Sequence, residues 1–173
     1  MKIKLIIAVD KNGVMGINNS LPWSLSDDLR HFKKETQNYP LIMGSNTYNS
    51  LPGILPGREH IVLSKTLEGD ENKSVFTSID EAINYCLESN YENVYVIGGA
   101  NIIKQFGYLK LFDELIITHV DATVEGDTFI DLDDDINIYN FAIKDVKNYT
   151  KNENNMYDFK IIHYIQKPER FFQ

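Results

Sequence analysis

The chain has 173 residues, of which 43% are hydrophobic and 24% are charged. This length predicts one domain over residues 1–173 that buries a core without disulfides or a structural metal. The composition excludes a disordered or collagen-like chain. The sequence has 17 Lys and Arg residues against 25 Asp and Glu residues, a net charge of −8. We expect no nucleic-acid partner, because phosphate recognition needs concentrated positive charge.

The sequence also indicates a compartment. The single cysteine, Cys86, has no partner for a disulfide within the chain, and no charged and then apolar leader precedes the first apolar segment. The longest apolar run, Leu5–Val9, is far shorter than the roughly 18 residues read as a membrane span. We therefore expect a cytoplasmic protein with no membrane partner.

Short β-rich segments alternate with helical patterns along most of the chain. In order, the pattern predicts a strand at Ile3–Val9, a helix at Leu25–Thr36, strands at Leu41–Met43, Ile61–Leu63 and Val75–Phe76, a helix at Ile79–Leu87, a strand at Val94–Ile97, a helix at Asn101–Phe106 and a strand at Leu115–Val120. Apolar strands separated by helices are typical of a mostly parallel sheet covered on both faces.

The C-terminal part has a different pattern. Phe141–Tyr149 and Tyr157–Gln166 lack helical periodicity, and the turn-like segment Asn152–Asn155 lies between them. The predicted fold class is therefore α/β, with a mostly parallel central sheet flanked by helices on both faces and an antiparallel C-terminal hairpin. Residues 164–173 form a tail that no pattern explains.

Asp28 stands within the apolar stripe of its predicted helix, together with Leu25, Leu29 and Phe32. It is either a carboxylate at the margin of the stripe that reaches solvent, or a buried anion that faces a ligand with hydrogen-bond donors. The adjacent Asp27 needs no such explanation. It completes a capping box in which Ser24 caps the helix.

Three other segments carry candidate functions. The long connection Gly13–Trp23 is either a lid over a ligand crevice or a surface loop anchored by Trp23. The segment Gly98–Ala100, between a strand and a helix, suits a pyrophosphate but also a plain Gly-Gly turn. Arg58, after a Pro-Gly turn, either grips a ligand carboxylate or makes a surface ion pair.

Several other patterns are incomplete. The acidic run that starts at Asp131 resembles a calcium loop, but Ile136 replaces its glycine and Ala142 stands where the bidentate Glu belongs. The four histidines lack metal-ligand spacing, and no P-loop or G-x-S-x-G motif is present. We expect no metal site, and we expect Cys86 to belong to the core.

In their order and spacing these segments resemble the chromosomal type of dihydrofolate reductase, from about Ile3 to Tyr164. The motifs that carry the resemblance are Ile6–Val9, Met15-Gly16, Leu21-Pro22-Trp23, Asp28-Leu29 with Phe32-Lys33, Ile42-Met43-Gly44 with Thr47, Leu55-Pro56-Gly57-Arg58, Val96–Ala100, Thr118-His119 and Glu125-Gly126-Asp127-Thr128.

The resemblance implies hydride transfer from NADPH to C6 of 7,8-dihydrofolate, with a proton delivered to N5. This reaction would support one-carbon metabolism and thymidylate synthesis and would make the chain an antifolate target. Asp28 would bind the 2-amino and N3 groups of the pterin, and Thr118 would join this network through water. The implied catalytic residues are Asp28, Trp23 and Thr118.

The resemblance also implies two sets of binding residues. The substrate set is Ile6, Ala8, Asp28, Phe32, Leu51, Leu55, Arg58, Ile97 and Thr118. The cofactor set, for NADPH, is Ala8, Val14, Met15, Gly16, Asn19, Ser20, Gly44, Ser45, Asn46, Thr47, Leu63, Ser64, Lys65, Thr77, Ile97, Gly98, Gly99, Ala100, Asn101, Ile102, Ile103 and Thr128.

The chain departs from the family pattern at three positions. Ile103 stands where an aromatic residue is common, and Ser45 and Asn101 stand where arginines are common. Lys65 is then the cation left for the adenosine 2′-phosphate.

Two alternatives remain at this stage: the related pyrimidine reductase of riboflavin synthesis, and a folate- or nucleotide-binding protein without turnover. We expect a monomer.

Overall fold

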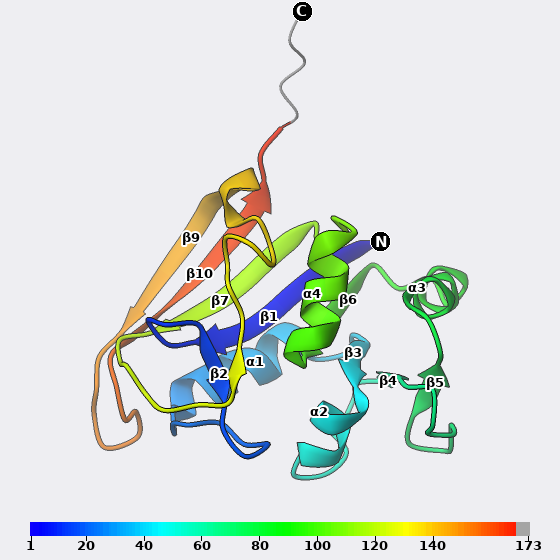
Figure 1. The fold of residues 1–173 in the computed structure, drawn as a ribbon, viewed down its shortest axis with the longest axis horizontal. Coiled ribbons are helices and arrows are strands. Elements are labelled where there is room, and N and C mark those ends of the chain that lie inside the picture. Colours follow the sequence, from blue (N-terminus) through cyan, green and yellow to red (C-terminus); the bar gives the residue numbers. More distant parts are fainter. Residues whose placement is uncertain (169–173) are drawn as a thin grey trace, which may run out of the picture.

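The computed structural model describes residues 1–168. Along the chain the elements are β1 (Lys2–Val9), β2 (Val14–Gly16), α1 (Ser26–Thr36), β3 (Leu41–Gly44), α2 (Ser45–Ser50), β4 (His60–Leu63), β5 (Ser74–Phe76), α3 (Ile79–Glu88), β6 (Asn93–Gly98), α4 (Ala100–Tyr108), β7 (Glu114–Val120), β8 (Thr128–Phe129), a 3-10 turn (Ile138–Asn140), β9 (Phe141–Tyr149) and β10 (Phe159–Gln166). Figure 1 shows their arrangement.

The central sheet has the strand order β5-β4-β3-β6-β1-β7-β10-β9. Strands β1 and β3 to β7 are parallel, and β10 and β9 are added antiparallel at one edge. The predicted fold class is therefore confirmed. The chain moves outward from β3 to β5 and then returns to place β6 beside β1. This reversal creates a switch point, where ligands bind in open α/β sheets.

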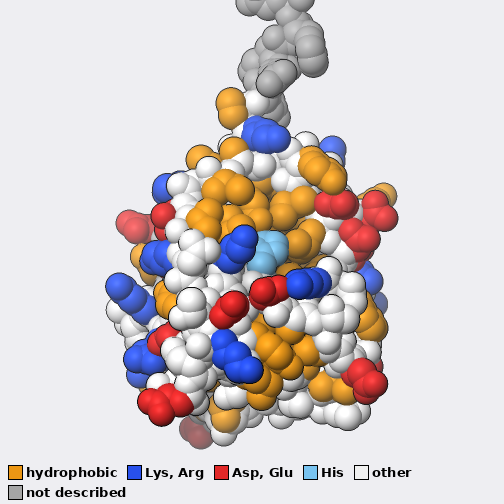
Figure 2. Space-filling view, turned by 90° about the vertical axis from the view of Figure 1, so that its left-hand side faces the viewer, with side chains coloured by type: hydrophobic (Ala, Val, Ile, Leu, Met, Phe, Trp, Pro, Cys, Tyr) orange, Lys and Arg blue, Asp and Glu red, His pale blue; other side chains and the backbone are white. Residues whose placement is uncertain are grey.

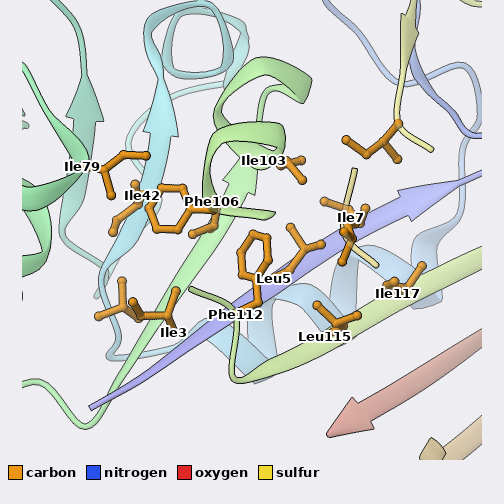
Figure 3. Packing of buried hydrophobic residues seen from close by; sticks show 14 of the residues in the cluster. Ile3, Leu5, Ile7, Ile42, Ile79, Ile103, Phe106, Phe112, Leu115 and Ile117 are labelled. Carbon is orange, nitrogen blue, oxygen red and sulfur yellow. The ribbon is translucent and has the colours of Figure 1, made fainter. Parts of the chain in front are cut away.

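Side chains of β1 alternate between two apolar layers. Leu5 and Ile7 pack with α3 and α4 on one face of the sheet, whereas Ile6 and Ala8 pack with residues of α1 and α2 on the other. Figure 1 shows α4 and α1 on opposite faces, and Figure 3 shows the layer beneath α4. A strand buried on both faces must be apolar throughout, which explains the continuous hydrophobic run that the sequence shows.

The sheet opens at the carboxyl end of its central strands. The pairing of β1 with β6 ends at Leu5 and Val96, whereas β1 remains paired with β7 as far as Val9 and His119. Beyond Leu5 the two middle strands therefore diverge. Ala8 and Ile97, which lie beyond this point, are only partly buried. The switch point, where β1 and β6 diverge, is therefore the expected position of a ligand-binding crevice.

The outer strand β9 is protected from further pairing. Lys144, Asp145 and Lys147 are exposed along it, and its register with β10 shifts between His163 and Tyr164. Figure 2 shows the side of the molecule on which β9 and β10 lie, where acidic and basic side chains cross a hydrophobic surface. Charges and irregular pairing at a sheet edge disfavour association with another strand.

Several details differ from the sequence prediction. Strands β2 and β8, which form a separate two-stranded sheet, and the short helix α2 were not expected, because they are too short to show a period. The prediction that Leu29 faces the core is wrong, since its side chain is 56% exposed. Cys86 is buried as predicted, and burial raises the pKa of its thiol to about 12.

Two further expectations concern the ends and surroundings of the fold. Residues 164–166 of the unexplained tail are the end of β10, and residues 169–173 lie outside the described residues. Within residues 1–168, none of the helices has the length and apolar character needed to cross a membrane.

Removing the ring of Phe106 should destabilise the fold without touching the crevice. Phe106 of α4 is fully buried, and its ring centroid lies 5.7 Å from that of Phe112. We expect Phe106→Ala to lower the free energy of unfolding by about 3–5 kcal/mol in urea titrations, because it removes apolar contacts and leaves a cavity. The matched control is Tyr108→Ala on the same helix, whose side chain is 86% exposed. A Phe106→Ala loss no larger than that of the control would contradict the packing described.

Candidate active site

A hydrogen bond joins Asp28 of α1 to Thr118 of β7. The Thr118 hydroxyl, near the carboxyl end of β7, donates to Oδ1 of Asp28 in the first turn of α1 at 2.6 Å. Thr118 is 4% exposed and Asp28 is partly buried. The reading in which Asp28 is a buried anion is therefore closer to the structure than a carboxylate freely solvated at the margin of the helix.

The environment of Asp28 favours its neutral form. Burial raises the pKa of this carboxyl from 3.8 to about 6, and the hydrogen bond from Thr118 opposes the rise. Burial is the larger effect, because removing a carboxylate from water costs more than one hydroxyl donor returns. A carboxyl group with a pKa near neutrality in a crevice is typical of a functional site.

The start of α1 is capped differently from the prediction. Leu25, not Ser24, is the N-cap residue, and its side chain accepts no hydrogen bond. The predicted capping box is therefore wrong. The backbone N–H of Asp27 donates instead to Oδ1 of Asn155 at 3.2 Å, from the loop between β9 and β10. Asp27 also forms an ion pair with Arg30, with 2.7 Å between Nη2 and Oδ1.

The segment Gly13–Trp23 is tied to β8 rather than lying free on the surface. Its strand β2 pairs with β8, the backbone N–H of Asp127 donates to the Gly16 carbonyl at 3.0 Å, and Oδ2 of Asp127 accepts from the Asn18 N–H at 2.9 Å. A hollow of about 500 Å³ lies between the two segments. A few hydrogen bonds therefore hold this segment against β8.

Trp23 ends this segment and is 6% exposed. Its indole N–H has no hydrogen-bond partner, and it is the one fully buried side-chain N or O atom of residues 1–168 for which this is so. Buried donors normally have partners, so this N–H is available to a ligand or a water molecule.

The glycines at the ends of β3 and β6 pack closely against neighbouring side chains. A Cβ on Gly98, whose φ is +146°, would lie 3.2 Å from Oγ1 of Thr47, and a Cβ on Gly44 would lie 3.2 Å from Cγ1 of Ile102. A cis peptide bond joins Gly98 to Gly99. Gly99 is the N-cap of α4 and has no side-chain cap, so the first N–H groups of α4 remain free for an anion. These features fit a pyrophosphate.

The remaining predicted cofactor residues lie mostly at the same edge of the sheet. Parallel β3, β4 and β6 end side by side there, and they bring together Gly44 to Thr47, Leu63 to Lys65 and Gly98 to Ile102. Met15, Gly16 and Thr128 lie at the β2–β8 pair, with Val14 buried and Asn19 and Ser20 exposed. Thr77 follows the outermost strand β5, where its hydroxyl donates to Glu81.

The surroundings of two predicted residues, Ile103 and Arg58, bear on their roles. Ile103 is fully buried in the core layer beneath α4, so its side chain offers no surface to a ligand (Figure 3). Arg58 is 8% exposed and donates from Nη1 to the hydroxyl of Thr36 and from Nε to the carbonyl of Pro56. Arg58 forms no ion pair with any of the described residues, 1–168. The alternative in which it makes a surface ion pair is therefore not supported.

Sequence reasoning missed three polar residues around the site. Asp10 is buried and accepts from the backbone of Val14 and Val124, which fixes the base of the lid. Asp127 and Asn155 make the contacts described above. Asp10 at the end of an apolar strand was a visible signal, whereas the contact of Asn155 with Asp27 spans 128 residues and leaves no local pattern.

The fold and the crevice are those of an α/β enzyme whose glycine-lined strand ends face a carboxyl group of raised pKa. A family model described as dihydrofolate reductase matches residues 2–166, and the chain therefore belongs to the dihydrofolate reductase family. It is an NADPH-dependent oxidoreductase that reduces dihydrofolate, as its family does. The pyrimidine reductase and the non-catalytic binding protein are not favoured.

Individual dihydrofolate reductases are similar to this chain over nearly its whole length. The dihydrofolate reductase of Bacillus subtilis (strain 168) is 34% identical over 170 residues, with 95% of each chain covered. That of Buchnera aphidicola is 34% identical over 164 residues, with 94% of this chain and 98% of the relative covered. Among solved structures, dihydrofolate reductase from Enterococcus faecalis complexed with NADP(H) and RAB-propyl superposes with a TM-score of 0.85 at 30% identity, covering 96% of this chain and 97% of that chain.

The raised pKa of Asp28 predicts a pH-dependent cost in stability. Between the unfolded value of 3.8 and the folded value of about 6, the folded protein binds more protons than the unfolded chain. The contribution of Asp28 to the free energy of unfolding therefore falls by about 2–3 kcal/mol as pH rises through that window. We expect Asp28→Asn to be more stable than the parent at pH 8 but not at pH 4, measured by urea unfolding at constant salt. An equal difference at the two pH values would contradict the raised pKa.

Proposed function

We propose that Asp28 is the group that holds the pterin ring of dihydrofolate, with its carboxylate oxygens facing the 2-amino and N3 groups. The observation that carries this proposal is the 2.6 Å hydrogen bond from Thr118, which leaves the other oxygen of Asp28 without a partner among the described side chains. Two donors on one edge of the ring suit a carboxylate. Thr118 then orients Asp28 and joins the same network through water.

The rest of the substrate lies along α1 and the segment after α2 in this proposal. Phe32, Leu51 and Leu55, all partly buried in one apolar cluster, wall the pterin and benzoyl rings. The carbonyls of Ile6 and Ile97, where β1 and β6 diverge, accept from the pterin amine. Arg58 binds the α-carboxylate of the glutamate tail, because a buried guanidinium gains much from an anionic partner.

The cofactor lies across the strand ends. When bound, NADPH supplies the hydride that passes to C6 of the substrate. The free N–H groups at the start of α4 receive the pyrophosphate beside Gly98 and Gly99. Ser45 to Thr47 approach it from the other side, and Ala8 admits both ligands closely. Ser64 and the exposed Lys65 meet the 2′-phosphate. Ile103 contributes through the packing of α4, since its side chain is buried.

The lid excludes water and Trp23 supplies a donor. Closure of Val14–Trp23 over the nicotinamide removes solvent from the reacting atoms, which strengthens every electrostatic contact there. The unpartnered indole N–H of Trp23 points to a role in binding the substrate directly or through a water molecule. N5 of the substrate then receives its proton close to Asp28, the ionisable side chain that this proposal places beside the pterin ring.

We also propose that the protein acts as a monomer in the cytoplasm. The charged and irregular outer strand β9 supports a monomer, because it offers no regular edge to a second copy. The buried, unpaired thiol of Cys86 is compatible with a reducing compartment.

Replacing Asp28 tests the central assignment. We expect Asp28→Asn to lower kcat for dihydrofolate at pH 7 by about 10²–10⁴-fold, because an amide cannot take part in supplying the proton that N5 receives. In the parent enzyme the rate should fall as pH rises past an apparent pKa of about 6, and this step should be absent in the variant. Loss of NADPH absorbance measures both, with the exposed Asp80→Asn on α3 as the control. Normal turnover by Asp28→Asn would contradict the assignment.

Replacing Lys65 tests the phosphate contact. We expect Lys65→Ala to raise KM for NADPH about 10-fold, the size of one charge-assisted contact, and to leave KM for NADH unchanged, because NADH lacks the 2′-phosphate. Lys144→Ala, on exposed β9, controls for the loss of one positive charge. An unchanged KM for NADPH would show that Lys65 does not meet the phosphate.

A further inference from the structure

The N-terminus of α1 is completed by a loop that lies far away in the sequence. The N–H of Ser26 donates to the Asn154 carbonyl at 3.0 Å, and the N–H of Asp27 donates to Oδ1 of Asn155 at 3.2 Å. The N–H of Met156 donates back to the Ser24 carbonyl at 3.0 Å. The loop between β9 and β10 thus supplies the acceptors that a local capping side chain would normally provide.

Asn155 is the centre of this contact. Its side chain is 1% exposed and uses both of its ends, since Nδ2 donates to Oδ2 of Asp27 at 2.7 Å while Oδ1 accepts from the Asp27 N–H. Its own backbone N–H donates to the side chain of Asn152 at 3.0 Å, and its carbonyl accepts from the Asn152 N–H at 3.0 Å. A buried amide held on every side has a single orientation, so it can fix the residue that it binds.

The same hairpin also fixes the partner of Asp28. Ile161 of β10 stands opposite Thr118 in the register with β7, only six positions after Asn155. Asp28 directly follows Asp27 on α1. The hairpin of β9 and β10 therefore contacts both partners of the hydrogen bond between Thr118 and Asp28. It pairs with the strand of Thr118 through β10, and it binds the residue before Asp28 through Asn155.

We propose that Asn155 is a positioning residue for the reduction of dihydrofolate, holding the first turn of α1 where the Asp28 carboxyl meets both Thr118 and the substrate. This inference rests on the role proposed above for Asp28. It adds that the geometry of the substrate-binding carboxyl is set by a side chain that touches neither ligand.

The alternative is that Asn155 only stabilises the fold, as any helix cap does. A simple cap would lower the unfolding midpoint and leave the kinetic and titration properties of the remaining folded molecules unchanged. A positioning residue would change them, because a misplacement of about 1 Å in a catalytic constellation costs up to about 10²-fold. The two roles therefore differ in measurable ways.

The first experiment compares Asn155→Ala with its neighbour Asn154→Ala in the full-length enzyme. Asn154 contributes its backbone carbonyl, and its exposed side chain makes no hydrogen bond within the described residues, so its substitution is a matched control. We expect Asn155→Ala to lower kcat/KM for dihydrofolate about 10-fold or more, with KM for NADPH unchanged. We expect Asn154→Ala to stay within about 2-fold of the parent, the scale of a surface substitution.

The second readout is the pH profile of kcat. Burial is the larger cause of the raised pKa of Asp28, so a first turn that moves away from β7 and admits water should lower the apparent pKa below about 6. The Thr118 hydroxyl, from β7, is the group that faces Asp28, and the ion pair between Asp27 and Arg30 lies on the same turn of α1. A merely structural cap would leave the profile where it is.

Coupling to Thr118 gives a third readout. In the Thr118→Val background Asp28 has already lost its partner, so Asn155→Ala should cost clearly less in kcat/KM than it does in the parent. Independent effects that simply multiply would overturn the proposal. So would a variant Asn155→Ala that loses stability while keeping both its kcat/KM and its pH profile.

A swap keeps the test valid if Asn155→Ala does not fold. Asn155→Asp alone places two carboxylates together, whereas the double variant Asp27→Asn/Asn155→Asp exchanges the amide and the carboxylate and restores a donor and an acceptor. Recovery of kcat/KM in the double variant supports the proposal, and recovery of the unfolding midpoint alone overturns it. Failure of the Asp28 assignment is distinguishable, because Asp28→Asn would then itself remain active.

Discussion

The structure depends on keeping one carboxyl group out of water while leaving it able to bind. Asp28 has a single side-chain partner, Thr118, and the hydrogen bond between them does not offset the cost of burial, which is why the pKa of Asp28 rises to about 6. A fold under selection for stability alone would place an apolar residue there. The two apolar layers on either side of the sheet offset this cost, and the helix that carries Asp28 packs on one of them.

The opening that admits the ligands is made by ending a strand pairing early. Because β1 leaves β6 after Leu5 but follows β7 to Val9, the crevice lies between two strands of one continuous sheet. Each wall is supported by a further strand of the sheet, β7 beside β1 and β3 beside β6. This support suits an enzyme that must hold two large anionic ligands at a fixed distance while its own net charge is −8.

Much of this arrangement could be predicted from the sequence because it depends on local patterns. Apolar runs gave the parallel strands, helical stripes gave α1, α3 and α4, and the misplaced polarity of Asp28 marked the site. Leu29 was misjudged because the helical period does not distinguish a position at the exposed margin of the stripe from one that faces the core. The cap on α1 was misjudged because Ser24 and Asp27 satisfy a local rule that the distant Asn155 overrides. Strand pairs as short as β2 and β8 carry too few residues to show any pattern at all.

The contact between Asp27 and Asn155 has a consequence for the order in which the molecule is made. Synthesis proceeds from the N-terminus, so α1 leaves the ribosome long before the residues that cap it, and β7 before the strand that pairs with it at Thr118. Phe159, Ile161 and Tyr164 of β10 belong to the two apolar layers, so this late strand completes the core as well as the surroundings of Thr118.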